Sequence, residues 1–269
     1  MRQYSKYWKS FTLGAQSAME YRVDFLLSMV SALWPIFIQY FLWKCIYAGT
    51  GQQSMFGYTY AQMITYVIIA NVVQRLTRTG FEYDMNDDIK NGGLDKYIVR
   101  PIGYFQYHMA SFLGRRYAQL VVTLAALAVV IVVVNQVYGG VIAPINVLFF
   151  IATLLLAFVL NFIVFFCVGM LAFTFAEIGF FYEAVRIVFI AMSGGIFPLD
   201  VFGPVVSGAL AFLPFKYTVN FPVDVLSGRV AGMEMLSGFG VQILWIAGLA
   251  LLSIWLWKRG VNKYISAGG

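Results

Sequence analysis

Long apolar stretches separated by short polar segments run through most of this chain. Residues 117–176 contain no Asp, Glu, Lys or Arg, and about 20 helical residues are enough to cross the hydrocarbon core of a bilayer. This stretch therefore predicts two membrane-spanning helices, joined by the turn-rich residues 135–146. Other apolar stretches predict spans near residues 24–47, 58–74, 183–199 and 239–257. The pattern indicates an all-α integral membrane protein with six transmembrane helices.

Residues 1–22 have an amphipathic pattern instead. Large apolar side chains recur at helical spacing, while polar side chains occupy the other side of the helix. The apolar stripe is Tyr4, Trp8, Phe11, Ala15 and Met19, and the polar side is Arg2, Lys6, Lys9 and Gln16. This predicts an interfacial helix in front of a transmembrane domain over residues 23–269. An ordinary membrane anchor and an elbow helix that steers the first span fit the pattern equally.

The apolar segment from residue 187 to residue 215 is repeatedly broken. Asp200 divides it into two parts that are each too short to cross the membrane, and glycines and prolines interrupt both parts. One crossing followed by a re-entrant hairpin fits this pattern, which predicts an extracellular re-entrant region over residues 200–238. Pro198 and Pro214 are expected to set helix ends there. Irregular backbone at membrane depth must be buried in protein or line a cavity, so this region is a candidate gate of a translocation path.

Composition and charge support the membrane interpretation. The chain is 61% hydrophobic and 11% charged, against about 25% charged residues in soluble proteins. An arrangement with both termini in the cytoplasm puts all Lys and Arg there except Lys44, Lys216 and Arg229, which is a strong positive-inside signal. The net charge of +6 therefore reflects topology, and nucleic-acid binding is excluded because the cations bracket spans and form no single basic face.

The largest cytoplasmic excursion covers residues 75–101 and holds the only dense charge cluster. Residues 81–90 predict a short helix, and Asn91-Gly92-Gly93 predicts its end, because Gly and Asn readily take the left-handed conformation. The following residues run up to Arg100-Pro101, where Pro disfavours helix at the preceding residue. A solvated loop is the simplest interpretation. A docking surface explains better the apolar side chains in this segment, which are Ile89, Leu94, Tyr97, Ile98 and Val99.

Sharper interpretations of the acidic cluster can be tested by spacing. A calcium loop fails, because Ile89 stands where the turn requires Gly. Asn86-Asp87-Asp88 begins a magnesium-diphosphate motif of a membrane prenyltransferase, which is kept as the alternative function, but the second cytoplasmic loop offers only Glu177 and Glu183. The single histidine, His108, is interpreted as an interfacial side chain and not as a metal ligand. The chain has no phosphate-binding loop, so any ATPase that drives it must be a separate chain.

Three short motifs occur in order along the chain, and each has a definite position relative to the predicted membrane spans. They are IKNGGLDKYIVRP at residues 89–101, GIFPL at residues 195–199, and LPFKY at residues 213–217, the last preceded by Pro204. Together with six spans, they resemble the permease subunit of an ABC-2 type exporter, with most similarity to the daunorubicin-resistance-like ABC-2 permeases. The resemblance covers nearly the whole chain, which makes residues 23–269 an ABC-2 type domain.

The resemblance implies a dimer of permease subunits, identical or different, each docked on a cytoplasmic ABC ATPase. The coupling residues would be Asp87, Asp88, Ile89, Gly92, Leu94, Asp95, Tyr97, Arg100 and Pro101, with residues 177–183 as a minor contact. The extracellular gate would comprise Gly195, Phe197, Pro198, Leu199, Pro204, Pro214 and Tyr217. No catalytic residue and no metal site is expected.

The implied activity is export across the plasma membrane by alternating access, in which the partner ATPase, and not this chain, binds ATP and Mg²⁺. Membrane lipids are the other expected partners. The apolar, uncharged spans favour a hydrophobic or amphipathic substrate, because a strongly charged substrate would require buried countercharges.

Overall fold

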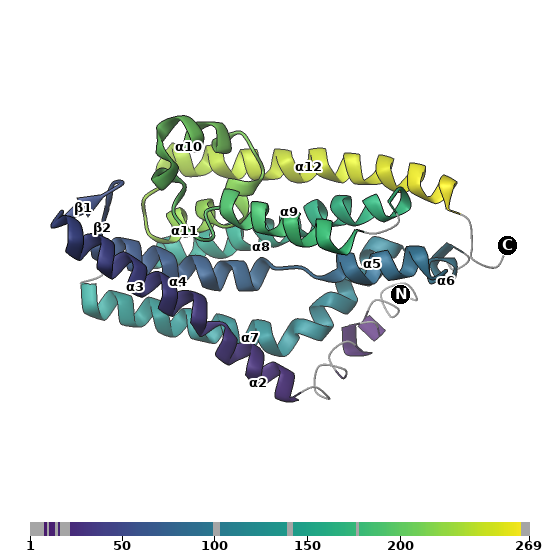
Figure 1. Cartoon of the computed structure of the whole chain (residues 1–269), viewed down its shortest axis with the longest axis horizontal. Helices are drawn as coiled ribbons and strands as arrows, with labels where there is room; N and C mark the ends of the chain where they lie inside the picture. The colour runs from purple at the N-terminus through teal and green to yellow at the C-terminus, as the bar shows by residue number, and fades with distance from the viewer. Residues whose placement is uncertain are drawn as a thin grey trace.

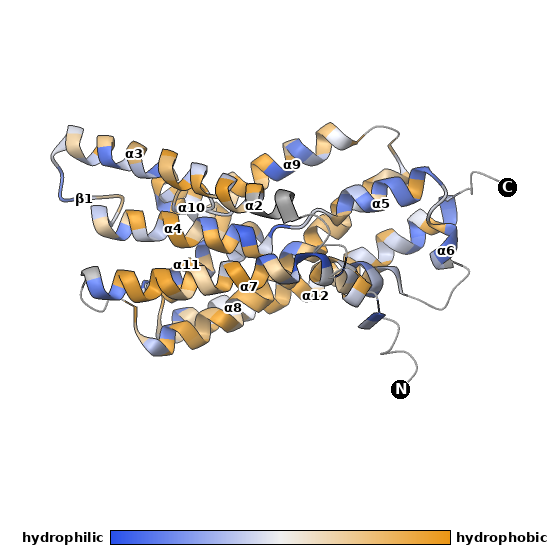
Figure 2. Cartoon of the chain, turned by 90° about the horizontal axis from the view of Figure 1, so that it is seen from below, coloured by the Kyte–Doolittle hydropathy of each residue, from blue (hydrophilic) through white to orange (hydrophobic). Residues whose placement is uncertain are grey.

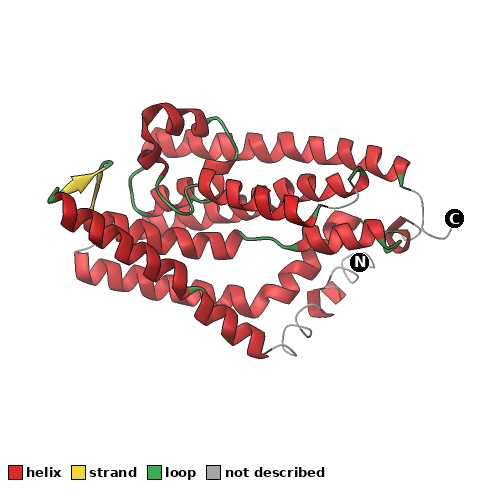
Figure 3. Cartoon of the chain, viewed as in Figure 1, coloured by secondary structure: helices red, strands yellow, loops and turns green. Residues whose placement is uncertain are grey.

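The computed structural model of the chain is built from α-helices that run mostly along one long axis (Figure 1). It describes residues 8–9, 11–13, 16, 22–98, 103–138, 142–175 and 178–264. The α-helices are α2 (Arg22–Ser31), α3 (Leu33–Thr50), α4 (Tyr60–Thr77), α5 (Phe81–Lys90), α6 (Asp95–Ile98), α7 (Tyr104–Tyr138), α8 (Pro144–Gly169), α9 (Gly179–Met192), α10 (Gly203–Ala211), α11 (Asn220–Leu226) and α12 (Gly232–Lys263). Shorter 3₁₀ turns are η1 (Met170–Phe173), η2 (Leu199–Phe202) and η3 (Phe215–Thr218). Strands β1 (Ser54–Met55) and β2 (Tyr58–Thr59) form a small antiparallel hairpin between α3 and α4, shown in yellow in Figure 3.

Four helical stretches in the described part of the chain are long and apolar enough to cross a membrane. They are Leu27–Thr50, Tyr104–Gln136, Pro144–Phe173 and Gly232–Lys263. Figure 2 shows apolar residues along these helices and polar residues concentrated at α5 and α6. The prediction of an all-α membrane protein is therefore confirmed.

Two further helices, α4 and α9, lie at predicted spans but are not among these four candidates. Most residues of α4, the helix at predicted span two, are buried against other helices. The helix at predicted span five, α9, has only 14 residues, about 21 Å at 1.5 Å per residue, which is shorter than the hydrocarbon core. It ends at Met192 and not near residue 199 as predicted. At predicted span three, α7 begins at Tyr104, before the uncharged stretch, and it bends along its length (Figure 1).

Polar side chains fasten the helices to one another inside the bundle. The Asn161 amide of α8 donates to the carbonyl of Thr77 at the end of α4 (2.5 Å). The Gln242 amide of α12 donates to the carbonyls of Thr153 in α8 and Tyr217 in η3, at 3.0 Å each. Helices in lipid gain little from burying apolar surface against one another, so such hydrogen bonds and close packing hold them together.

The predicted interfacial helix over residues 1–22 lies mostly outside the described residues. Within the described part, the Trp8 ring stacks on Phe11 with centroids 5.3 Å apart, and Phe11 contacts the Tyr117 ring of α7 edge to face. This segment therefore contacts α7.

Candidate functional site

The predicted helix of the cytoplasmic loop is present as α5. Glu82 and Asp84 lie in its first turn and Lys90 in its last, an order that complements the helix dipole. The helix ends at Asn91, and Gly92 takes a φ of 73°, a left-handed conformation that glycine adopts without strain. The predictions of a helix over residues 81–90 and of its end are confirmed.

One face of α5 points into the interior of the chain. Phe81, Met85 and Ile89 recur at helical spacing and are buried together with Leu94, which is 0% exposed. Phe81 stacks on Phe162 of α8 with ring centroids 4.1 Å apart. The prediction that Ile89 and Leu94 belong to an exposed docking surface is therefore wrong, because both side chains complete the core on which α5 rests.

The accessible face of the segment formed by α5 and α6 is polar. Asp87, Asn91 and Lys96 are exposed, and Tyr97 is half-buried, with its ring edge to face against Tyr104 at 4.8 Å. Gly92 lies in the turn between the two helices, and Asp95 begins α6. The side chain of Ile98 and residues 99–102, which include the predicted Val99, Arg100 and Pro101, lie outside the described part.

Asp88 connects this segment to α7. Its carboxylate accepts from Lys96 Nζ (3.0 Å) and from the Tyr104 hydroxyl (3.1 Å), and it lies 3.4 Å from His108 Nε2. Burial alone would raise the pKa of Asp88, but the neighbouring His108 and Lys96 outweigh burial and hold this pKa below its usual value. His108 is buried, at 4% exposed, so its side chain packs inside the chain, and its place at the depth of the membrane interface stays a prediction.

The predicted acidic cluster is divided among separate partners. Asp84 pairs with Arg115 of α7, whereas Asp88 takes the partners given above, and Asp87 faces outward. Within the described residues, no three or more His, Cys, Asp or Glu side chains come close enough together to hold a metal ion. The transferase interpretation therefore finds no support in the geometry.

A buried ion pair joins α5 to α9. Glu82 is 0% exposed, and its Oε1 accepts from Nη2 of Arg186, which is 8% exposed. The guanidinium of Arg186 also lies 3.5 Å from Glu183 and 5.3 Å from the centre of the Tyr83 ring. A carboxylate with no exposure must be paired, because an isolated buried charge is strongly unfavourable. The two helices are therefore fixed to each other at this point. Of the minor contact predicted over residues 177–183, Glu177 lies outside the described residues and Glu183 lies beside Arg186.

At the other end of α9, the chain turns at Gly194, which has a φ of 81°. Its carbonyl accepts from the hydroxyl of Tyr66 in α4 (2.7 Å), and the same hydroxyl accepts from the Asn220 amide of α11 (2.9 Å). The prediction that Pro198 ends this helix is wrong, because the helix stops earlier, where Tyr66 and Asn220 hold the turn. Pro214 precedes η3 and ends no spanning helix.

The predicted gate residues lie along the segment that follows, in which the chain folds back from Gly194 to η3. The Gly195 carbonyl accepts from the Gln74 amide, and the Phe197 ring lies edge to face against Trp43 of α3, with centroids 6.0 Å apart. The Tyr217 hydroxyl donates to the Ala211 carbonyl (2.9 Å). Pro198, Leu199, Pro214 and Tyr217 are buried, whereas Pro204 is exposed at the start of α10.

A cluster of charged side chains connects this part of the chain to the β-hairpin. The Arg229 guanidinium lies 3.7 Å from the centre of the Tyr58 ring and donates to the Gly57 carbonyl (2.9 Å). It also lies 3.6 Å from Asp200 and 4.0 Å from Asp224. Burial raises the pKa of Asp224 to about 7, against the opposing effect of Arg229. Arg229 therefore interacts with the hairpin, with η2 and with α11.

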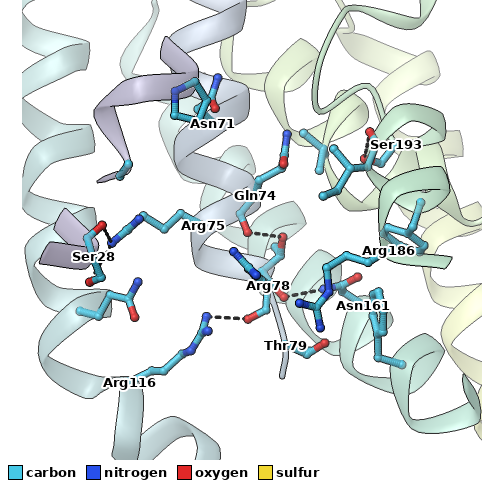
Figure 4. A pocket seen from close by; sticks show the side chains of 18 of the residues that line it. Ser28, Asn71, Gln74, Arg75, Arg78, Thr79, Arg116, Asn161, Arg186 and Ser193 are labelled. Atoms are coloured by element: carbon cyan, nitrogen blue, oxygen red, sulfur yellow. Dashed lines mark hydrogen bonds between the residues drawn. The ribbon is translucent and has the colours of Figure 1, made fainter. Parts of the chain in front are cut away.

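A cavity of about 450 Å³ opens between α2, α4, α7, α8 and α9. Figure 4 shows four arginines around it, of which Arg116 and Arg186 reach in from α7 and α9 and Arg78 lies between them. The fourth, Arg75, points to the Ser28 carbonyl of α2, to which it donates at 2.6 Å. We call this space the arginine cavity.

Of these cations only Arg186 is buried, and it is paired with Glu82 and Glu183, whereas Arg75 and Arg116 are half-buried and Arg78 is exposed. The sequence did not predict that these four cations line one cavity, and the preference for a hydrophobic or amphipathic substrate stays a prediction.

From the sequence alone, membrane topology accounts for all four arginines. Their convergence could not be read from spacing, because they come from three helices and from the residue after α4. One signal was present, however: Asn161 is the only amide inside the apolar stretch 147–173, and a polar side chain within a membrane span is a functional candidate by default.

One comparison with known proteins gives a match. A family model described as "ABC-2 family transporter protein" matches residues 33–268. No curated protein and no solved structure was found to match the chain.

Proposed function

The chain belongs to the ABC-2 family of transporter proteins, and from this premise we propose that it is the permease subunit of an ATP-binding cassette exporter in the plasma membrane. An ABC ATPase subunit is its partner by family. In this proposal the ATPase binds ATP and Mg²⁺, two permease subunits form the transport unit, and alternating access moves an amphipathic substrate outward. Both termini of each subunit face the cytoplasm.

The proposal includes six crossings of the membrane. α4 and α9 would be the second and fifth crossings. α4 differs from an ordinary span because most of its residues are buried against other helices, and α9 differs because it is short. The end of α9 is continued by the folded-back segment from Gly194 to η3, whose backbone is buried in protein, as irregular backbone at membrane depth must be.

The observation that carries the proposal is the buried Glu82–Arg186 pair. The polar face of α5 supplies a contact for the ATPase, and the ion pair fixes α5 to α9, which lines the arginine cavity and leads into the predicted gate. A nucleotide state of the ATPase can drive transport only if it changes contacts with the permease. A rigid connection between the contact surface and a cavity-lining helix satisfies this requirement.

Charge reversal on the accessible face of α5 tests the proposal. Asp87 is exposed and can be changed without disturbing the core, and juxtaposed like charges at an interface are strongly unfavourable. Asp87→Lys should insert normally but lose most co-purification with its ATPase and most ATP-dependent transport. Lys258→Glu, a reversal at an exposed site on α12, is the control and should retain both. Full co-purification and full transport by Asp87→Lys would refute the assignment of this surface to the ATPase.

A further inference from the structure

The arginine cavity combines four cations with no acidic side chain in its lining. Its described lining includes Arg75, Arg78, Arg116 and Arg186 and contains neither Asp nor Glu. Arg186 is buried and Arg75 and Arg116 are half-buried, whereas Arg78 is exposed at the mouth of the cavity. Cations partly removed from water repel one another more strongly than cations in bulk water do. An anion in the cavity would relieve this repulsion.

The partners of the four cations leave most of their charge uncompensated. Within the described residues, only Arg186 has carboxylate partners, Glu82 and Glu183. Arg75 and Arg116 donate to uncharged oxygens, those of Ser28 and the Arg78 carbonyl. The guanidinium of Arg78 makes no hydrogen bond or ion pair within the part of the chain that the structure describes. Three of the four guanidinium groups therefore carry positive charge that no described carboxylate balances.

The rest of the lining combines hydroxyl, amide and apolar side chains. Asn71, Gln74 and Asn161 bring amide groups to the cavity, and Pro35, Phe189, Ile190 and Val219 form apolar parts of its wall. A volume of about 450 Å³ lies within the usual range of small-molecule sites, about 300–1,000 Å³. The cavity therefore has room for an anionic group and for the beginning of an apolar chain.

We propose that the arginine cavity binds a phosphate-type anionic headgroup, as carried by an amphiphilic substrate. Guanidinium groups match phosphate oxygens with paired, charge-assisted hydrogen bonds. Arg78 and Arg116 are the principal contacts, because within the described residues neither donates to another side chain, whereas Arg75 also donates to the Ser28 hydroxyl. Arg75 and the amides around the cavity orient the same group. This inference rests on the proposed transport function and specifies the substrate class for it.

Ligand binding to the full-length chain in detergent tests the proposal. The probes are short-chain dihexanoyl phosphatidate, zwitterionic dihexanoyl phosphatidylcholine and inorganic phosphate, with thermal stability followed by tryptophan fluorescence. Phosphatidate should raise Tm, whereas phosphatidylcholine should have little effect. Stabilisation by inorganic phosphate at similar concentrations would support the anion site and identify a free anion as its occupant. Tighter binding of phosphatidate would support the site and identify a lipid-like headgroup. Equal binding of the zwitterionic and anionic lipids, or no binding of either anion, would overturn the proposal.

Matched arginine variants locate the site. Arg78→Gln and Arg116→Gln should each weaken phosphatidate binding by about tenfold or more, since each removes a charge-assisted contact. Arg115→Gln is the control, because Arg115 is the neighbour of Arg116 in sequence, pairs with Asp84 and does not line the cavity; its affinity should stay within about twofold of wild type. The Tm of each ligand-free variant monitors folding. Unchanged affinity in both cavity variants would exclude this cavity as the site.

Failure of this proposal and failure of the transport function are distinguishable. If ATPase co-purification and its sensitivity to Asp87→Lys persist without anion binding, only the substrate class is wrong. If anion binding is present but no ATPase associates with the chain, the site stands and the transport function falls.

Discussion

Asp224 is an acid that the surrounding chain removes from water. Its side chain is buried in α11 outside the candidate membrane-spanning helices, and burial raises its pKa from an ordinary value of 3.8 to about 7. Arg229 lowers this pKa, whereas Asp200 raises it further. Between these two pKa values the folded state keeps a proton that the unfolded state has released. Asp224 therefore favours folding below about pH 4, and this contribution is lost as the pH rises to about 7.

We expect the Tm of the wild-type chain in detergent to fall between about pH 4 and pH 7 because of this group. Asp224→Asn, which cannot ionise, should reduce the slope across this range. Asp200→Asn is the control, because the Asp200 side chain is 47% exposed and should contribute less. Tryptophan fluorescence during heating at several pH values measures the effect. An unchanged slope in Asp224→Asn would show that another group titrates.

At the scale of elements, the connection between α5 and α9 depends on two buried charges. Glu82 and Arg186 neutralise each other where water does not reach. Removing one partner leaves an uncompensated charge and typically costs about 3–5 kcal/mol, whereas replacing both with uncharged side chains costs much less. An exposed pair contributes only about 0–1 kcal/mol. The two kinds of pair can be compared on the same helix, since Asp84 and Arg115 form an exposed one.

We therefore expect Glu82→Gln to destabilise the folded chain by about 3–5 kcal/mol. The double variant Glu82→Gln/Arg186→Met should recover part of this loss in a double-mutant cycle. Asp84→Asn, the matched control, should change stability by less than about 1 kcal/mol. Denaturant unfolding in mixed micelles measures all variants. Equal losses for Glu82→Gln and Asp84→Asn would contradict the distinction between buried and exposed pairs.

Local signals predicted some elements, and long-range contacts decided others. The helix over residues 81–90 and its end at Asn91-Gly92 depend on neighbouring residues, so the sequence predicted both. The end of α9 was misplaced at Pro198, because Gly194 is held by Tyr66, a residue far away in the sequence. Leu94 was assigned to the surface because the apolar residues of this segment do not reveal, from the sequence, the core cluster with Phe81 and Phe162 in which Leu94 is buried.

At the scale of the whole molecule, the arrangement of charge predicts which end faces which compartment. The β-hairpin lies at one end of the long axis and α5 and α6 at the other (Figure 1). The positive-inside rule assigns the α5–α6 end to the cytoplasm. The arginine cavity lies beside the end of α4 from which α5 continues, so it would open nearer the cytoplasmic side.

Cysteine labelling tests this orientation. Cys45 and Cys167 are first replaced, and single cysteines are introduced at the exposed Ser54 and Asn91. A membrane-impermeant thiol reagent should label the cysteine at residue 54 in intact cells, and the cysteine at residue 91 only after permeabilisation. Labelling at residue 91 in intact cells would invert the topology and, with it, the assignment of α5 to the ATPase.

Arg186 belongs both to the arginine cavity and to the ion pair with α5, and this shared position has a thermodynamic consequence. An occupant that attracts Arg186 changes the energy of the pair with Glu82, and any partner that displaces α5 changes the affinity of the cavity. Because free energy is a state function, the two effects are equal: the factor by which the docked ATPase alters the affinity for the anion is the factor by which the anion alters the affinity for the ATPase. Under the proposed anion site and the proposed ATPase contact on α5, the occupant of the cavity would therefore change the binding of the ATPase without contacting it.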